Sequence, residues 1–101
     1  MSMSKYSIIS KLEDNKAHLK NLGVSSIELF GSYASGVAKN ESDIDFLVSF
    51  TKGRGNYKDK LRLLHLLEDL FGKKIDLGEK GKLRKEIQNE VEKNATLKAN
   101  I

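Results

Sequence analysis

The stretch DIDFLVSF, residues 43–50, is the most strand-like part of the chain and decides its fold. Polar and apolar residues alternate at its start, so a strand would place Asp43 and Asp45 on one face and Ile44 and Phe46 on the other. Twice the rise of a strand separates the two acidic residues by about 6.5–7 Å. Charges that close repel unless a cation lies between them, and Mg²⁺ prefers such oxygen ligands. The pair therefore predicts half of a divalent metal site.

A third carboxylate, Asp76, interrupts the apolar residues Ile75 and Leu77 in a second short strand-like run, residues 74–77. A buried acid without a partner is costly. Its position is explained if this strand lies beside residues 43–50 and Asp76 faces the same metal ions. The alternative for all three carboxylates is that they are ordinary surface acids.

A phosphate-binding turn is predicted upstream, where residues 27–30 (IELF) form a short strand that leads into Gly31 and Ser32. A strand followed by glycine and a helix start presents backbone N–H groups to an anion, and glycine lets a phosphate approach closely. With the carboxylates, this turn describes a nucleoside triphosphate site in which metal bridges phosphate and protein. The alternative for Ser32 is a plain helix N-cap, and Gly36 is more simply a turn residue.

Helices and strands are interspersed along the rest of the chain. Apolar spacing predicts a helix over residues 5–22, a short helix from residue 32, a loop over 52–56, a leucine-rich helix over 61–71 ending at Gly72, and a strand over 74–77 ending at Gly78. A final helix is marked by Leu83, Ile87, Val91 and Leu97. The expected class is therefore α/β or α+β, a small mixed β-sheet flanked by helices, in a single domain of residues 1–101.

Composition excludes several classes of protein. The 101 residues are 39% hydrophobic and include no cysteine, so the chain is expected to fold without disulfides, thiolate zinc sites or thiol catalysis. No apolar run approaches the ~18 residues of a membrane span, and the first residues do not resemble a signal peptide. We therefore expect a cytoplasmic protein with no membrane partner.

The net charge of +4 is gathered in one segment, residues 51–62, where five bases accompany the single acid Asp59. Such a segment suits an anionic partner, although a solvated loop and helix start is the simpler interpretation of so short a run. Nucleic-acid surfaces are broader and interleaved with aromatic residues, and Tyr57 is the only aromatic residue here. The sequence gives little support to direct nucleic-acid binding.

These motifs together resemble those of the minimal nucleotidyltransferases of the DNA polymerase β-like superfamily. The resemblance rests on Gly31-Ser32 followed by Gly36, on SDIDFLV at residues 42–48, and on KIDL at residues 74–77 after a leucine-rich helix. It covers nearly the whole chain, because the length and the order of elements also fit. It implies the nucleotidyltransferase fold.

One departure from the pattern lies at Ser35, where many relatives carry arginine immediately before the second glycine. Its absence removes a phosphate or structural contact. Lys39, Lys52 and Arg54 are the candidates to replace it.

The resemblance also implies a role for each matching residue. Asp43 and Asp45 would coordinate two Mg²⁺ ions, and Asp76 would complete the second ion's site and accept the proton of an acceptor hydroxyl. Gly31 and Ser32 would hold the β and γ phosphates of ATP. The acceptor would attack the α-phosphate, and pyrophosphate would leave.

Minimal members of this family are typically paired with a HEPN-domain protein as antitoxin and toxin. The resemblance therefore implies an antitoxin that transfers AMP to a tyrosine of a cognate HEPN toxin within a heteromeric complex. The alternative is a non-catalytic binding module that neutralises its partner by forming a complex. The leucine-rich helix carries more apolar positions than one core face needs, so part of it could face that partner.

Overall fold

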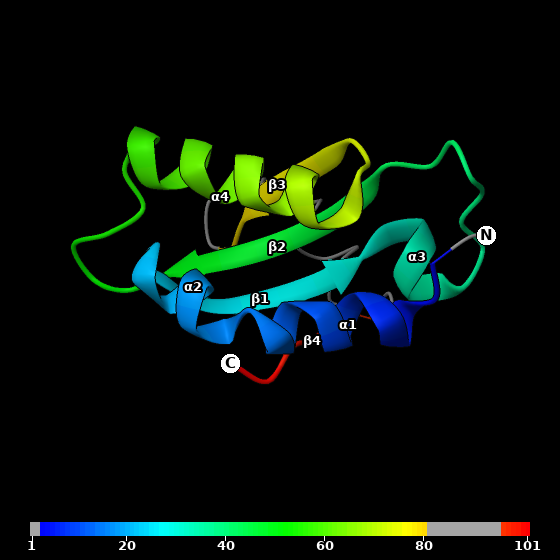
Figure 1. Cartoon of the computed structure of the whole chain (residues 1–101), viewed down its shortest axis with the longest axis horizontal. Helices are drawn as coiled ribbons and strands as arrows, with labels where there is room; N and C mark the ends of the chain where they lie inside the picture. The colour runs from blue at the N-terminus through cyan, green and yellow to red at the C-terminus, as the bar shows by residue number, and fades with distance from the viewer. Residues whose placement is uncertain (1–2, 81–95) are drawn as a thin grey trace.

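A four-stranded mixed β-sheet forms the centre of the computed structural model, which describes residues 3–80 and 96–101. In chain order the elements are α1 (Lys5–Asp14), α2 (Lys16–Asn21), β1 (Val24–Phe30), α3 (Gly31–Ser35), β2 (Ile44–Phe50), α4 (Tyr57–Phe71), β3 (Ile75–Glu79) and β4 (Leu97–Lys98). Figure 1 shows α1, α2 and α4 on one face of the sheet and α3 at the end of β1. This architecture confirms the predicted fold class. None of the described helices is long and apolar enough to cross a membrane.

The strands lie in the order β3-β2-β1-β4. β1 pairs antiparallel with both β2 and β4, whereas β2 and β3 are parallel. β2 and β3 therefore begin at the end of the sheet where β1 finishes, and there Phe30 pairs with Asp45 and Asp45 pairs with Asp76. We call this the carboxylate end (Asp43, Asp45 and Asp76). The opposite end, where residues 51–56 connect β2 to α4, is the loop end.

The hydrophobic core lies between the sheet and the three longer helices. Alternate residues of β2 enter it, and Ile44, Phe46 and Val48 are at most 1% exposed. Their neighbours in the core come from α1, α2, β1 and α4: Ile8, Leu12, Leu19, Ile27, Leu29, Leu63 and Leu67. Because side chains alternate along a strand, burial of these three residues directs Asp45 to the other face of the sheet. Core packing thus sets the orientation of the carboxylate.

The single helix predicted over residues 5–22 is wrong, because the chain breaks into α1 and α2 at Asn15. The Asn15 side chain donates a hydrogen bond to the Lys11 carbonyl at 2.8 Å, and its backbone N–H bonds to the Leu12 carbonyl at 3.0 Å. Asparagine side chains compete in this way for carbonyls that a continuing helix would use. The apolar stripe still runs through both helices, since Ile8, Leu12 and Leu19 are all fully buried.

Other element boundaries differ from prediction by a few residues. β1 begins at Val24, Asp43 precedes β2, and β3 continues through Gly78 to Glu79. α4 begins at Tyr57 instead of residue 61, because the Asn56 side chain accepts a hydrogen bond from the Asp59 N–H and caps the helix.

The predicted final helix falls mostly outside the described residues. Leu83, Ile87 and Val91 all lie there. Leu97, which the sequence predicts in the same helix, belongs instead to strand β4, where it pairs with Leu29.

Candidate active site

The carboxylate end brings together the acids that the sequence singled out. Asp45 and Asp76 are direct neighbours in the parallel pairing of β2 and β3, so their side chains leave the same face of the sheet. Asp43 stands one residue before β2 and is exposed, as is Asp76. Asp45 is partly buried between them and the chain that follows β1.

The electrostatic state of Asp45 reflects this crowding. Burial raises the pKa of Asp45 to about 6, with further increases from the charge of Asp76, a side-chain hydrogen bond with Asp76, and the charge of Asp43. A hydrogen bond between two carboxyl groups requires one of them to be protonated. Burial and the two neighbouring carboxylates thus disfavour ionisation of Asp45.

Gly31 lies against the Asp45 carboxylate, so a side chain in its place would force that carboxylate to move. A Cβ atom at this position would lie 2.3 Å from Asp45 Oδ2. The φ angle of Gly31 is also +73°, in the left-handed region that favours glycine. The start of α3 is therefore packed directly onto the central carboxylate, which joins the predicted phosphate turn to the predicted metal site.

Ser32 is the second residue of α3 and is partly exposed beside Gly31. The alternative in which Ser32 caps the helix is wrong, because Phe30 occupies the N-cap position and no side chain caps the helix there. Gly36 ends α3 with a φ of +76°, which confirms it as a turn residue. Ser35, the position where many relatives carry arginine, is exposed at the end of α3.

The negative charge of these carboxylates suits a cation, although their side chains are not arranged as a complete set of metal ligands. Among residues 3–80 and 96–101, no three His, Cys, Asp or Glu side chains are grouped as ready metal ligands. The geometry does give a close pair, Asp45 and Asp76, with Asp43 near enough to raise the pKa of Asp45. Carboxylate oxygens that repel one another are suitable ligands for Mg²⁺, which also retains water and substrate oxygens.

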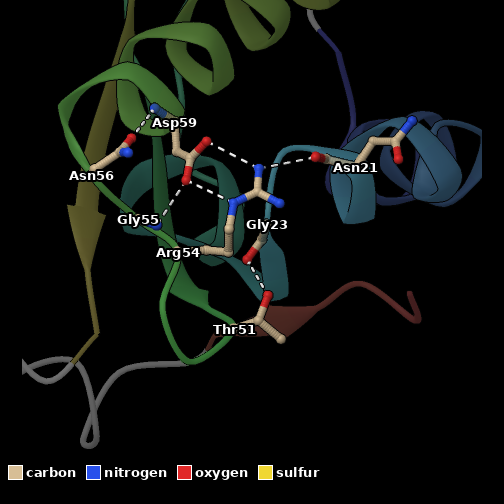
Figure 2. Close-up of polar contacts among 7 residues, drawn as sticks. All are labelled: Asn21, Gly23, Thr51, Arg54, Gly55, Asn56 and Asp59. Carbon is tan, nitrogen blue, oxygen red and sulfur yellow. Dashed lines mark hydrogen bonds and ion pairs between the residues drawn. The ribbon is translucent and has the colours of Figure 1, made fainter.

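Arg54 does not lie near this site and cannot replace the missing arginine. Figure 2 shows it at the loop end, where its guanidinium donates two 3.0 Å hydrogen bonds to the Asp59 carboxylate and one to the Asn21 carbonyl. The Gly55 N–H donates a further bond to Asp59 at 2.9 Å. Arg54 thus holds the loop to α2 and α4. Lys52 belongs to the same loop, which follows β2 at the end of the strand opposite to Asp45.

Lys39 is the remaining candidate cation, because it lies in the connection between α3 and β2 at the carboxylate end. Sequence reasoning missed two more lysines there, Lys73 and Lys74, which immediately precede β3. The Lys73 ammonium donates to the Asn40 carbonyl, and Lys74 is exposed. Their position immediately before the strand that carries Asp76 could have identified them from the sequence.

The sequence matches a family described as nucleotidyltransferase domain over residues 9–98. It is 40% identical over 79 residues to protein adenylyltransferase MntA of Thermococcus cleftensis, covering 74% of this chain and 79% of that protein. It is 46% identical over 55 residues to a Methanocaldococcus jannaschii protein named as a candidate protein adenylyltransferase, covering 54% of this chain and 55% of the relative. The chain therefore matches only about half the length of that relative.

The fold is similar to that of several solved structures. One described as a candidate minimal nucleotidyltransferase has a TM-score of 0.76 and 30% identity, covering 92% of this chain and 94% of that one. Two others share the fold alone. A toxin–antitoxin structure with AMP-PNP has a TM-score of 0.67 and 22% identity, covering 87% and 72% of the two chains. A structure of a tri-AMPylated Shewanella oneidensis HEPN toxin with an MNT antitoxin has a TM-score of 0.61 and 19% identity, covering 91% and 71%.

The family match over residues 9–98 includes all the motifs, from Gly31-Ser32 to Asp76. These similarities confirm the resemblance drawn from Gly31-Ser32 and from the SDIDFLV run. The chain belongs to the nucleotidyltransferase domain family, among the minimal nucleotidyltransferases related to MntA.

Proposed function

We propose that this protein is a Mg²⁺-dependent protein adenylyltransferase, which moves AMP from ATP to a tyrosine hydroxyl of a HEPN-type toxin and so acts as its antitoxin. The observation that carries the proposal is the parallel pairing of Asp45 with Asp76 against the Gly31 backbone. The relative MntA is named a protein adenylyltransferase. Solved structures with the same fold pair a toxin with an antitoxin, one of them with AMP-PNP.

The metal ligands in this proposal are Asp43 and Asp45, with Asp76 completing the site of a second ion. Bound Mg²⁺ would neutralise charge on the triphosphate and lower the pKa of the acceptor hydroxyl. The raised pKa of Asp45 is consistent with this role, because burial and the charges of Asp76 and Asp43, which raise it, are both features of a site where a cation would bind.

The transfer itself forms one bond and breaks one. The acceptor oxygen attacks the α-phosphorus of ATP, the bond from that phosphorus to the bridging oxygen breaks, and pyrophosphate leaves. Asp76, exposed at the start of β3, would accept the hydroxyl proton. Gly31 and Ser32 would bind the β and γ phosphates, because the start of α3 offers backbone N–H groups that no side chain caps.

The test is incubation of the protein with ATP, Mg²⁺ and the product of the adjacent gene, followed by intact mass of that product. We expect the product to gain the mass of AMP on a tyrosine, and we expect EDTA to prevent it. The Asp43→Asn/Asp45→Asn variant should be inactive. Asp69→Asn is the matched control, because Asp69 is an exposed acid on α4, and α4 packs on the face of the sheet opposite to the Asp45 side chain.

Two results would count against adenylyl transfer. Modification by the Asp43→Asn/Asp45→Asn variant at the parent rate would remove the metal assignment. Neutralisation of the partner without any change in its mass would favour the non-catalytic binding module instead. Ser35, in place of the arginine of many relatives, is the feature of this chain that favours that second function.

A further inference from the structure

Lys74 stands directly beside the candidate metal ligands. It precedes β3 by one residue, and its carbonyl accepts a hydrogen bond from the Ile44 N–H at 3.1 Å, so the pairing of β2 with β3 extends to it. Ile44 is paired with Ile75, and one residue back in each chain the same register places Lys74 next to Asp43. The position of Lys74 is therefore set by the sheet.

The Lys74 side chain leaves the same face of the sheet as Asp76. Ile75, which lies between them, is 6% exposed and belongs to the core. Because side chains alternate along a strand, its two neighbours point away from the core, and both are exposed. Asp45 leaves this face as well, since it is paired with Asp76. An ammonium group therefore shares the face that carries the carboxylates.

Four residues form an array that is two strands wide. Asp43 and Asp45 lie at the start of β2, and Lys74 and Asp76 lie at the start of β3, which Figure 1 shows beside β2. Neighbouring strands are about 4.8 Å apart, and residues two apart along a strand are separated by about 6.5–7 Å. Lys74 is the one basic member of the array. A substrate held over the three carboxylates would be within reach of its long, flexible side chain.

No residue in the described part of the chain forms an ion pair with Lys74. The ion pairs there join Arg54 to Asp59, Lys60 to Glu79 and Lys80 to Glu28. The adjacent lysine, Lys73, donates instead to the Asn40 carbonyl, which ties the connection before β2 to the residues before β3. Of these two lysines, Lys73 has a structural contact and Lys74 keeps its ammonium available for a ligand.

The predicted phosphate turn lies on the opposite flank of this array. Gly31 packs against Asp45 from the end of β1, and β1 and β3 lie on either side of β2. In the proposed function, Gly31 and Ser32 bind the β and γ phosphates there. The α-phosphate connects those phosphates to the attacking oxygen, whose proton passes to Asp76 on β3. The α-phosphate would therefore lie between the turn and β3, over the array that includes Lys74.

We propose that Lys74 binds a nonbridging oxygen of the α-phosphate of ATP, the group that is transferred. This inference rests on the proposed function, because that function assigns the β and γ phosphates to the turn. A lysine ammonium has three donors, and its hydrogen bonds to phosphate oxygens are strengthened by charge. Lysine, arginine and Mg²⁺ stabilise transferring phosphoryl groups in this way. Lys74 would thus supply from β3 a positive charge that Ser35 does not supply from α3.

The test measures the binding of three probes by NMR titration of amide resonances in the presence of Mg²⁺. AMP carries only the α-phosphate, pyrophosphate represents the β and γ phosphates, and adenosine carries no phosphate. Lys74→Met should weaken AMP binding by at least about tenfold, the loss expected for one hydrogen bond to a charged group. Pyrophosphate and adenosine should bind this variant as they bind the parent. Lys74→Arg should recover most of the affinity for AMP.

Lys20→Met is the matched control, because it removes the same charge from an exposed lysine of α2. The adjacent Asn21 carbonyl accepts a hydrogen bond from Arg54, which places Lys20 at the loop end. This control should bind all three probes as the parent does. Ser32→Ala should show the reverse pattern, with weaker binding of pyrophosphate and unchanged binding of AMP. The amide spectra of the free proteins verify that each variant keeps the parent's fold.

Three binding results would overturn the assignment of Lys74. These are unchanged AMP affinity in Lys74→Met, a loss of pyrophosphate affinity without a loss for AMP, and an equal loss for AMP and adenosine. A parent protein that binds AMP no more tightly than adenosine would also reject it, because no group would then contact the α-phosphate. Weaker AMP binding by Lys74→Met, with no AMP transfer by the parent to the adjacent gene's product, would support the Lys74 contact and reject the proposed function.

Discussion

Asp45 and Asp59 lie at opposite ends of the sheet, and their surroundings shift their acidity in opposite directions. Asp59 is 5% exposed, and hydrogen bonds from Arg54 and the Gly55 N–H lower its pKa to about 2. In the described part of the chain no cation lowers the pKa of Asp45, and burial with two neighbouring carboxylates raises it to about 6. An acid that is paired and hydrogen-bonded stabilises the fold, whereas an acid whose pKa is raised by burial and like charge is a candidate for a functional site. The loop end is therefore structural, and the carboxylate end is the candidate for chemistry.

The largest effect should follow from removing the unsatisfied charge. Asp45→Asn should reduce AMP transfer by more than about 100-fold. Mutation of residues that only hydrogen-bond to metal ligands already reduces metal affinity or activity about 10–100-fold. The same change should raise the melting temperature, because it removes a partly buried charge and relieves repulsion from Asp76 and Asp43. Transfer assays and thermal unfolding without metal give both readouts. A variant with a lower melting temperature than the parent would show that the ionised Asp45 stabilises the fold, as Asp59 does.

The contact between Gly31 and Asp45 can be separated from backbone strain by comparing two glycines. Gly31→Ala and Gly36→Ala each place a side chain at a φ above +70°, which costs about 1–2 kcal/mol. Only the Gly31 variant would also push against the Asp45 carboxylate, since nothing lies within 4 Å of a Cβ at Gly36. Gly31→Ala should therefore lose more stability in urea and most of its transfer activity. Equal losses of stability and activity in the two variants would show that the contact between Gly31 and Asp45 has no effect.

At the loop end, Asp59→Asn should lower stability and leave kcat unchanged. The lowered pKa means that the ionised Asp59 stabilises the folded protein above its ordinary value of 3.8, and that this stabilisation is lost as the pH falls toward about 2. Urea unfolding between pH 2 and pH 5 should thus show a shallower loss of stability in the variant than in the parent. If stability fell with pH equally in the variant and the parent, Asp59 would not contribute to the loss of stability in acid.

The smallest expected effect is at the start of α4. Asn56→Ala removes the side chain that accepts the Asp59 N–H at 2.9 Å, and loss of such an N-cap costs about 1 kcal/mol. Asn56→Asp keeps the acceptor and should stay within a few tenths of the parent's stability. Chemical denaturation distinguishes the two, and transfer activity should be equal in both.

Much of this fold could be predicted because its signals are local. The alternation in residues 43–50 indicates β2, and the leucine spacing followed by Gly72 indicates α4 and its end. Asn15 breaks the first helix without disturbing the apolar spacing on either side, so periodicity alone could not show it. β4 contains two residues, too few for any pattern.

The site was predictable in its residues and not in its arrangement. Two acids on one strand and a third on another suggest a cluster, but the pairing of Asp45 with Asp76 is a matter of strand register. The same limitation explains why Arg54 could be a candidate from sequence to replace the missing arginine, although it lies at the loop end. Its partner Asp59 is only five residues away, yet the ion pair depends on how the loop folds back onto α4.

The parallel pairing of β2 and β3 has a consequence for how the protein acquires its site during folding. Asp45 and Asp76 become neighbours only after the chain has crossed from β2 through α4 and returned to the same end of the sheet. Parallel pairings that close long loops form slowly compared with local helices. We therefore expect hydrogen-exchange protection of α4 to precede that of β3. A chain released from the ribosome would gain its helices first and its paired carboxylates last.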